Sequence, residues 1–101
     1  MAYEIQPQPR VIKYLKKIKD RHLKELFIDK IYTDIAVNPT IGEATSGDLA
    51  GFRSLGFKYA RTAYRIAYII DDATIVIIIL VGAHENFYQE LKKIAHMKNN
   101  D

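Results

Sequence analysis

The sequence predicts an α+β fold in which a small antiparallel sheet packs against an N-terminal helical hairpin and a C-terminal helix. Two stretches in the first half of the chain, residues 11–18 and 23–35, repeat apolar residues at helical spacing. Residues 57–81 instead alternate or accumulate β-branched and aromatic residues, as strands do. A third amphipathic stretch follows Gly82. With 101 residues, 49% of them hydrophobic, the chain is expected to form a single domain, residues 1–101, with a modest core.

The N-terminal half is predicted to contain a short strand and two antiparallel helices. The strand, residues 3–5, is closed by Pro7 and Pro9, because proline cannot pair within a central ladder. The second helix ends at Asn38, since a residue that precedes proline avoids the helical conformation. The apolar stripes are Val11, Tyr14, Leu15 and Ile18 in the first helix and Leu23, Phe27, Ile31 and Ile35 in the second.

The C-terminal half is predicted to contain three strands and a final helix. Asn86 followed by Gln89 resembles a capping box at the start of that helix. The predicted element order is therefore β-α-α-β-β-β-α, an α+β layer fold. The expected segments are a loop at residues 39–48, a short strand near 49–55, a long strand at 57–70, a turn at 71–72 and an apolar central strand at 73–81.

Composition excludes several kinds of site. The chain has no cysteine, so it has neither a disulfide framework nor a thiolate metal site. It shows no acidic cluster that would hold a divalent metal, and no cofactor is expected. Its longest apolar run, residues 74–81 with their neighbours, is far shorter than the roughly 20 residues that span a bilayer. These features predict a soluble cytoplasmic protein with no membrane partner.

Basic residues are unevenly distributed along the chain. The net charge is only +3, yet residues 49–70 contain four basic residues and no acid. A basic sheet face of this kind suits a polyanion or an acidic protein partner. The same reasoning applies less strongly to the basic residues of segment 10–24, for which a solvated helix face is the preferred explanation. The four basic residues are Arg53, Lys58, Arg61 and Arg65.

Strand parity predicts where a functional site forms. Arg61 and Arg65 are four residues apart, so on one strand they point to the same face. An even-numbered hairpin loop would place Arg65 on the same face as a row of residues that runs to His84. Tyr88 would then lie one helical turn further on. A three-residue loop would put His84 elsewhere. The predicted row is Ile78, Leu80, Gly82 and His84.

Arginine, histidine and tyrosine around small residues suit chemistry on a phosphodiester. The planar guanidinium grips phosphate oxygens, and imidazole exchanges protons near neutral pH. The ribose 2′-hydroxyl of RNA is a built-in nucleophile, so metal-free cleavage is feasible. Each residue also has a structural interpretation: His84 as a helix cap, Tyr88 as a cover for the core edge, and Arg65 as a ligand of backbone carbonyls.

Three segments, "GDLAGFRSL", "AYRIAYII" and "VGAHENFYQEL", together resemble the RelE/ParE superfamily of toxins from bacterial type II toxin–antitoxin modules. They occur in the family order and, with the helical hairpin, extend the resemblance over nearly the whole chain. The resemblance implies a toxin neutralised by a cognate antitoxin. In the RelE-like branch it implies cleavage of ribosome-bound mRNA, and in the ParE-like branch inhibition of DNA gyrase without RNA cleavage.

For the RelE-like branch, the resemblance also assigns residues. Arg65 matches the arginine that contacts the scissile phosphate, and His84 and Tyr88 match residues of charge stabilisation or proton transfer. Lys58 and Arg61 match basic residues of the preceding strand, and Arg53 is a further candidate for RNA binding. Whether Lys58 or His84 is the general base stays open. The basic face predicts an acidic antitoxin segment that lies over the sheet or beside the terminal helix.

This chain departs from the RelE-like pattern at a few positions. Many RelE-like members carry arginine where this sequence has His84, and charged residues where it has Gly56 and Ala60. Histidine is the better acid–base group, which favours mRNA cleavage. The thinner basic strand keeps gyrase inhibition as the alternative.

Overall fold

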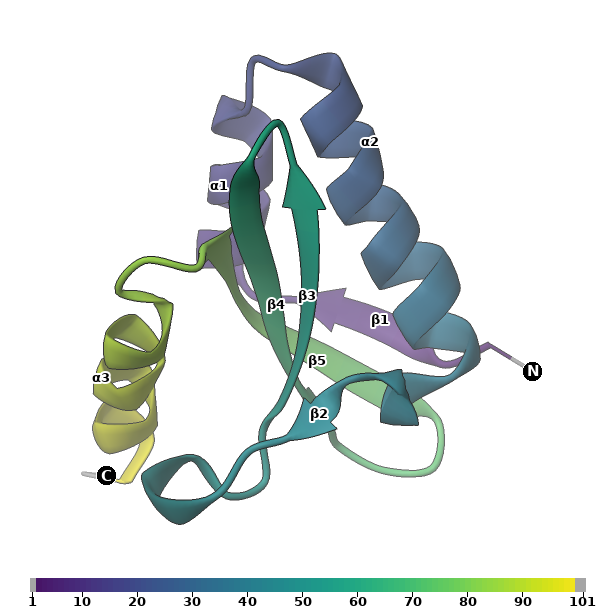
Figure 1. Ribbon diagram of the computed structural model, residues 1–101. Coiled ribbons are helices and arrows are strands. Elements are labelled where there is room, and N and C mark those ends of the chain that lie inside the picture. The colour runs from purple at the N-terminus through teal and green to yellow at the C-terminus, as the bar shows by residue number, and fades with distance from the viewer. Residues whose placement is uncertain (1, 100–101) are drawn as a thin grey trace.

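A computed structural model describes residues 2–99 of the chain, and its helices and strands are labelled in Figure 1. Among these residues, no helix is both long and apolar enough to cross a membrane. In chain order the elements are β1 (Glu4–Pro7), α1 (Pro9–Lys17), α2 (Arg21–Asp29), a π-helical continuation η1 (Lys30–Ile35), a 3-10 turn η2 (Pro39–Ile41), β2 (Glu43–Ala44), a second 3-10 turn η3 (Gly47–Leu49), β3 (Arg53–Tyr59), β4 (Thr62–Ile70), β5 (Ile75–Ala83) and α3 (Phe87–Asn99).

The five strands form one mixed sheet in the order β1-β5-β4-β3-β2. The pairs from β5 to β2 are antiparallel, as predicted, whereas β1 pairs with β5 in parallel. The α+β class is confirmed, but the expectation of a wholly antiparallel sheet is wrong. β1 lies at the edge of the sheet, where Pro7 has no second neighbour that needs its missing N–H group.

The helical hairpin covers one face of the sheet. The predicted apolar stripe of its second helix is buried in full, with Phe27, Ile31 and Ile35 at 0% exposure. Phe27 also meets Phe57 and Tyr64 of the sheet in edge-to-face contacts, with ring centroids 5.0 and 5.6 Å apart. The hairpin turn is fixed by Asp20, whose carboxylate accepts hydrogen bonds from the first amides of α2.

The C-terminal helix α3 covers part of the opposite face, so the sheet lies between two helical layers (Figure 1). Phe87, Leu91 and Ile94 of α3 pack on Ala67 and Ile79 of the sheet. Because α3 shields only this part of the face, the β3–β4 end stays open. Asn86 precedes the helix with a left-handed φ of 63°, and its carbonyl accepts from the Glu90 amide, so it occupies the N-cap position in an unexpected conformation.

The long strand predicted at residues 57–70 is in fact a hairpin. β3 and β4 meet at a two-residue turn, Ala60–Arg61, in which φ is 49° and 70°. Positive φ at both positions is the geometry of a type I′ turn, which usually takes Asn-Gly. Since neither residue is Asn or Gly, the sequence carried no signal for this turn.

The β4–β5 hairpin places most of the predicted row on the face of Arg65, but through a pairing that differs from the expected one. Five residues separate the paired Ile70 and Val76, so the even number on which the predicted row depended is not found. A β-bulge between Ala67 and Tyr68 of β4 leaves Ile79 as an extra residue on β5. Beyond the bulge the even positions of β5 return to the face of Arg65. Leu80 and Gly82 therefore lie where predicted, whereas Ile78, which pairs with Tyr68, lies on the hairpin side.

Candidate functional site

The register of β3, β4 and β5 brings the chemically active side chains onto the face that α3 leaves open. Directly paired residues of neighbouring strands point to the same face. Two adjacent rows carry the polar groups, and the second row is closed by the His84 amide, which donates to the Ala63 carbonyl at 2.8 Å. The rows are Gly56–Arg65–Gly82 and Lys58–Ala63–His84.

A pocket of about 380 Å³ opens over these rows. Lys58, Arg65 and His84 line it together with Ser54 and Glu43. Two permanent cations against one carboxylate leave its wall with positive charge. Such a wall suits an anionic ligand, and the imidazole adds a group that exchanges protons.

Arg65 is held in one position across β3. Its Nη1 donates to Ser54 Oγ at 2.9 Å, and its guanidinium carbon lies 5.6 Å from the centroid of the Tyr88 ring. A Cβ atom at Gly56 would lie 3.4 Å from Arg65 Cζ and Nη1, an ordinary contact, so the guanidinium packs directly beside this position. Arg65 Nε is buried and has no acceptor among the described residues.

Tyr88 supports this arrangement from α3. Its hydroxyl lies 3.2 Å from Ser54 Oγ, and its ring meets His84 edge-on, with centroids 6.0 Å apart. Tyr88 is half-buried and does not line the pocket, whereas His84 is exposed and does. Tyr88 therefore contacts both Arg65 and His84 from outside the pocket, so its position supports these two side chains.

A clamp on β4 fixes the opposite wall of the pocket. The buried Tyr68 hydroxyl donates to the Pro39 carbonyl at 2.6 Å and accepts from the Gly42 amide at 2.9 Å. Burial raises the pKa of Tyr68, so the hydroxyl keeps the proton that it donates. A side chain at Gly42 would collide with this hydroxyl. The clamp delivers the next residue, Glu43, into register with Ser54.

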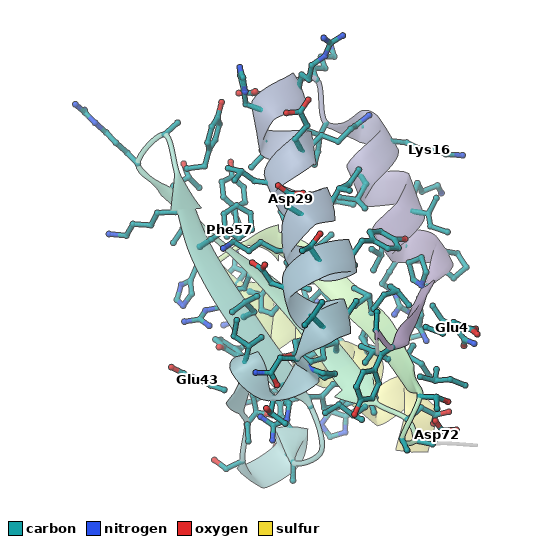
Figure 2. The ribbon with its side chains drawn as sticks, turned by 90° about the vertical axis from the view of Figure 1, so that its right-hand side faces the viewer. Glu4, Lys16, Asp29, Glu43, Phe57 and Asp72 are labelled. Carbon is teal, nitrogen blue, oxygen red and sulfur yellow. The ribbon has the colours of Figure 1, made fainter. Side chains whose placement is uncertain are left out.

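Glu43 and Ile41 complete the lining of the pocket, one with a carboxylate and the other with an apolar surface. Glu43 pairs with Ser54 and thus shares the face of Arg65. Figure 2 shows Glu43 on the same side of the view as Phe57, away from Glu4 and Asp72 at the far end of the sheet. Ile41 is 47% exposed and presents an apolar surface at the pocket.

Two of the predicted RNA-binding residues lie outside the pocket. Arg61 is in the tight turn, not on a strand, so the prediction that it shares a strand face with Arg65 is wrong. Arg53 pairs with Tyr68 and lies on the hairpin face. Its Nη1 donates to the Gly42 carbonyl at 2.8 Å, which reinforces the loop clamp. Lys58, by contrast, lines the pocket as a basic residue should.

Sequence reasoning missed Ser54, Glu43 and Gly42. Ser54 is 2% exposed and touches both Arg65 and Tyr88, but a lone serine in a strand carries no signal before the register is known. Glu43 lay in a segment predicted as loop. Among the described residues, no three His, Cys, Asp or Glu side chains gather as a metal site.

The chain thus folds as a small sheet between a helical hairpin and a closing helix, with a basic pocket at the open end of the sheet. Residues 5–92 match the family model described as "ParE-like toxin of type II bacterial toxin-antitoxin system". The chain therefore belongs to this family of toxins. Comparison with curated proteins finds no match.

Solved structures of RelE toxins share the fold. The RelBE2 toxin–antitoxin complex of Mycobacterium tuberculosis contains a chain of 23% identity and TM-score 0.72, with 83% of this chain and 100% of that chain covered. A mutant of Escherichia coli RelE in the free state has 21% identity and TM-score 0.72, with 95% and 98% covered. The chain in the intact E. coli RelBE complex has 22% identity and TM-score 0.65, with 80% and 95% covered. At these identities the likeness concerns the fold.

Proposed function

We propose that this toxin is a metal-free endoribonuclease that cleaves mRNA on the ribosome and so inhibits translation. The observation that supports the proposal is the pocket itself, which brings Arg65, His84 and Lys58 together over a sheet face that is open to a ligand. The resemblance to the RelE-like branch assigns RNA chemistry to the matching residues.

Arg65 is the phosphate-binding residue in this proposal. Its guanidinium is already held by Ser54 before any substrate binds, so little reorganisation is needed as charge grows on the phosphorus oxygens. Lys58 adds a second cation at the pocket, and Ile41 offers an apolar surface for a base. The substrate would thus be positioned by two cations and one apolar contact.

The proton transfers fall to His84 and Glu43. His84 is exposed at the pocket and donates a proton to the departing 5′-oxygen. Glu43, on the opposite wall, accepts the proton of the attacking 2′-hydroxyl, a role that Lys58 would fill if Glu43 does not. The bond from phosphorus to the 5′-oxygen breaks as the bond to the 2′-oxygen forms. The products are a 2′,3′-cyclic phosphate and a 5′-hydroxyl.

The test uses purified toxin and ribosomes programmed with a defined mRNA, at a fixed Mg²⁺ concentration that keeps the ribosomes intact. Wild-type toxin should cut the bound message and leave free RNA nearly uncut, because the ribosome supplies the geometry. Arg65→Ala should lower the rate by about 10²–10³, the cost of losing one electrostatic donor. Arg21→Ala, an exposed arginine on α2, is the matched control. Full activity of a folded Arg65→Ala, His84→Ala double variant would refute the mechanism.

Inhibition of DNA gyrase is the second candidate. The match to the ParE-like family model favours it, as does Gly56 at a position where RelE-like members often carry charge. A supercoiling assay with purified gyrase separates the two. Loss of supercoiling with no cut in ribosome-bound mRNA would make gyrase the target.

The partner that we propose is a cognate antitoxin with an acidic amphipathic helix. An apolar groove of about 230 Å³ runs between the outer faces of α1 and α2. Ile28 and Tyr32 line it at 42% and 45% exposure, and Lys16 and Lys24 flank it. Apolar side chains of a helix would fill the groove, and its acidic side chains would meet the two lysines. In Figure 2, Lys16 projects from α1 at the outer side of the hairpin.

Antitoxin binding is tested by charge substitution in the groove. Ile28→Glu should weaken binding about 10- to 100-fold, since burial of one isoleucine contributes roughly 1.5–3 kcal/mol. Met97→Glu is the matched control on α3, where the methionine is 65% exposed. If Met97→Glu weakens binding and Ile28→Glu does not, the antitoxin lies beside the terminal helix and the groove proposal fails.

A further inference from the structure

Ser54 takes no part in the bond making or the proton transfers of the proposed reaction. Its side chain is buried, at 2% exposure, and its hydroxyl lies 2.9 Å from Arg65 Nη1 and 3.2 Å from Tyr88 Oη. A buried hydroxyl needs partners for both its proton and its oxygen. An apolar residue would fill the same space without this requirement, so the hydroxyl suggests a role in the site.

The direction of the first hydrogen bond follows from the chemistry of the partners. Arginine has donors and no acceptor, so Ser54 Oγ accepts from Arg65. Ser54 Oγ also lies 3.2 Å from Tyr88 Oη, where either hydroxyl can be the donor. The chain therefore runs from Arg65 through Ser54 to Tyr88. It links one strand arginine, through a buried serine, to the first turn of α3.

Arg65 needs such a restraint because its observed position has a cost. Its Nε is buried without an acceptor, and an unmet donor of this kind costs about 1–3 kcal/mol. Rotation of the side chain into solvent would relieve that cost. The hydrogen bond to Ser54 and the contact with the Tyr88 ring oppose the rotation.

We propose that Ser54 is the positioning residue of the site, and that Tyr88 acts through Ser54 and His84 and does not itself transfer a proton. Ser54 fixes the guanidinium above the pocket and holds the Tyr88 ring against the edge of His84. This inference rests on the proposed function for its kinetic meaning. The hydrogen-bond chain itself can be tested without any activity.

The kinetic test compares Ser54→Ala, Tyr88→Phe and the double variant in the ribosome-bound cleavage assay. Ser54→Ala, which removes a hydrogen bond to the charged Arg65, should lower kcat about 10-fold or more, and Tyr88→Phe, which removes a neutral hydrogen bond, about 2- to 10-fold. Both should leave KM unchanged. The double variant should be no slower than the slower single one, and all variants should keep the shape of the wild-type pH–rate profile. Ser54→Thr, which keeps the hydroxyl, should recover most of the loss. Thr62→Ala, an exposed hydroxyl at the start of β4, is the control.

A parallel thermal-unfolding cycle on the same variants keeps the result independent of activity. The losses in melting temperature from Ser54→Ala and Tyr88→Phe should not add, because both break the same bond. If wild-type toxin cleaves no mRNA, the proposed function fails. The unfolding cycle still decides whether Arg65, Ser54 and Tyr88 are linked by hydrogen bonds. Additive losses in melting temperature would show that Ser54 and Tyr88 are not linked by a hydrogen bond. Additive losses in rate, or a Tyr88→Phe profile that lacks one limb, would overturn the positioning role alone.

Discussion

Substitutions at Gly56 should separate the effect of this position on stability from its effect on activity. The residue lies within β3, paired with Arg65, and a Cβ atom there would sit 3.4 Å from Arg65 Cζ and Nη1. Alanine at this position makes an ordinary contact. Glycine within a strand costs about 0.5–1 kcal/mol relative to alanine, so Gly56→Ala should raise the melting temperature by roughly 2–8 °C. Its cleavage rate should stay close to that of the wild type.

Valine at the same position tests the reasoning further. Its additional methyl groups extend into the space of the guanidinium, so Gly56→Val should separate Arg65 from Ser54. The fold should remain as stable as that of Gly56→Ala, because valine favours strands. The cleavage rate should fall by about 10- to 100-fold, below the 10²–10³ ceiling for complete loss of the arginine. Single-turnover cleavage and thermal unfolding measure the two quantities. A Gly56→Val toxin that cleaves at the wild-type rate would show that the position of Arg65 is unimportant.

Three other regions yield predictions. Hydrogen bonding from Tyr59 lowers the pKa of Asp20, so this carboxylate stabilises the fold above pH 5 and the contribution is lost as pH falls through the lowered pKa. In Asp20→Asn the melting temperature should therefore fall less steeply as the pH is lowered into the acidic range. A fall as steep as that of the wild type would contradict this. Gly42→Ala should cost about 1–3 kcal/mol in urea unfolding, since its Cβ meets the Tyr68 hydroxyl, and wild-type stability would disprove the clamp. Replacing Ala60–Arg61 by Asn-Gly should add roughly 1–2 kcal/mol, because both residues have positive φ; loss of RNA cleavage in that variant would return Arg61 to the site.

The helices were predictable because their apolar spacing is regular, and the buried stripe of α2 follows it residue by residue. The β3–β4 turn was not, since Ala60 and Arg61 adopt positive φ without the residue types that announce it. The sheet face on which His84 lies was predicted correctly, but the even hairpin loop assumed in that prediction is not present. An odd loop would have placed it on the other face, and the extra residue Ile79 reversed that effect. Counting odd and even positions therefore cannot predict which face a residue lies on when a strand contains a bulge that the sequence does not indicate.

The candidate site was predictable only in its outline. Arg65 and His84 stood out because they are polar residues within or directly after apolar strands. Ser54 and Glu43 did not, because their meaning depends on which residue faces them across the sheet. That pairing is set by the Tyr68 clamp on the loop before β2, a contact between residues far apart in the chain.

The bulge at Ile79 has a consequence for the position of α3. Ile79 and Leu80 both point toward α3 opposite Ala67, so two aliphatic side chains press on the helix where a regular ladder would place one. Deleting Ile79 would leave every pairing partner of β5 in place on either side. It would remove one buried side chain from beneath α3 and change the local bend of the strand, because a bulge increases twist without altering the register beyond it. We expect this deletion to shift α3, and with it Tyr88, while Arg65 keeps its pairing partners Gly56 and Gly82.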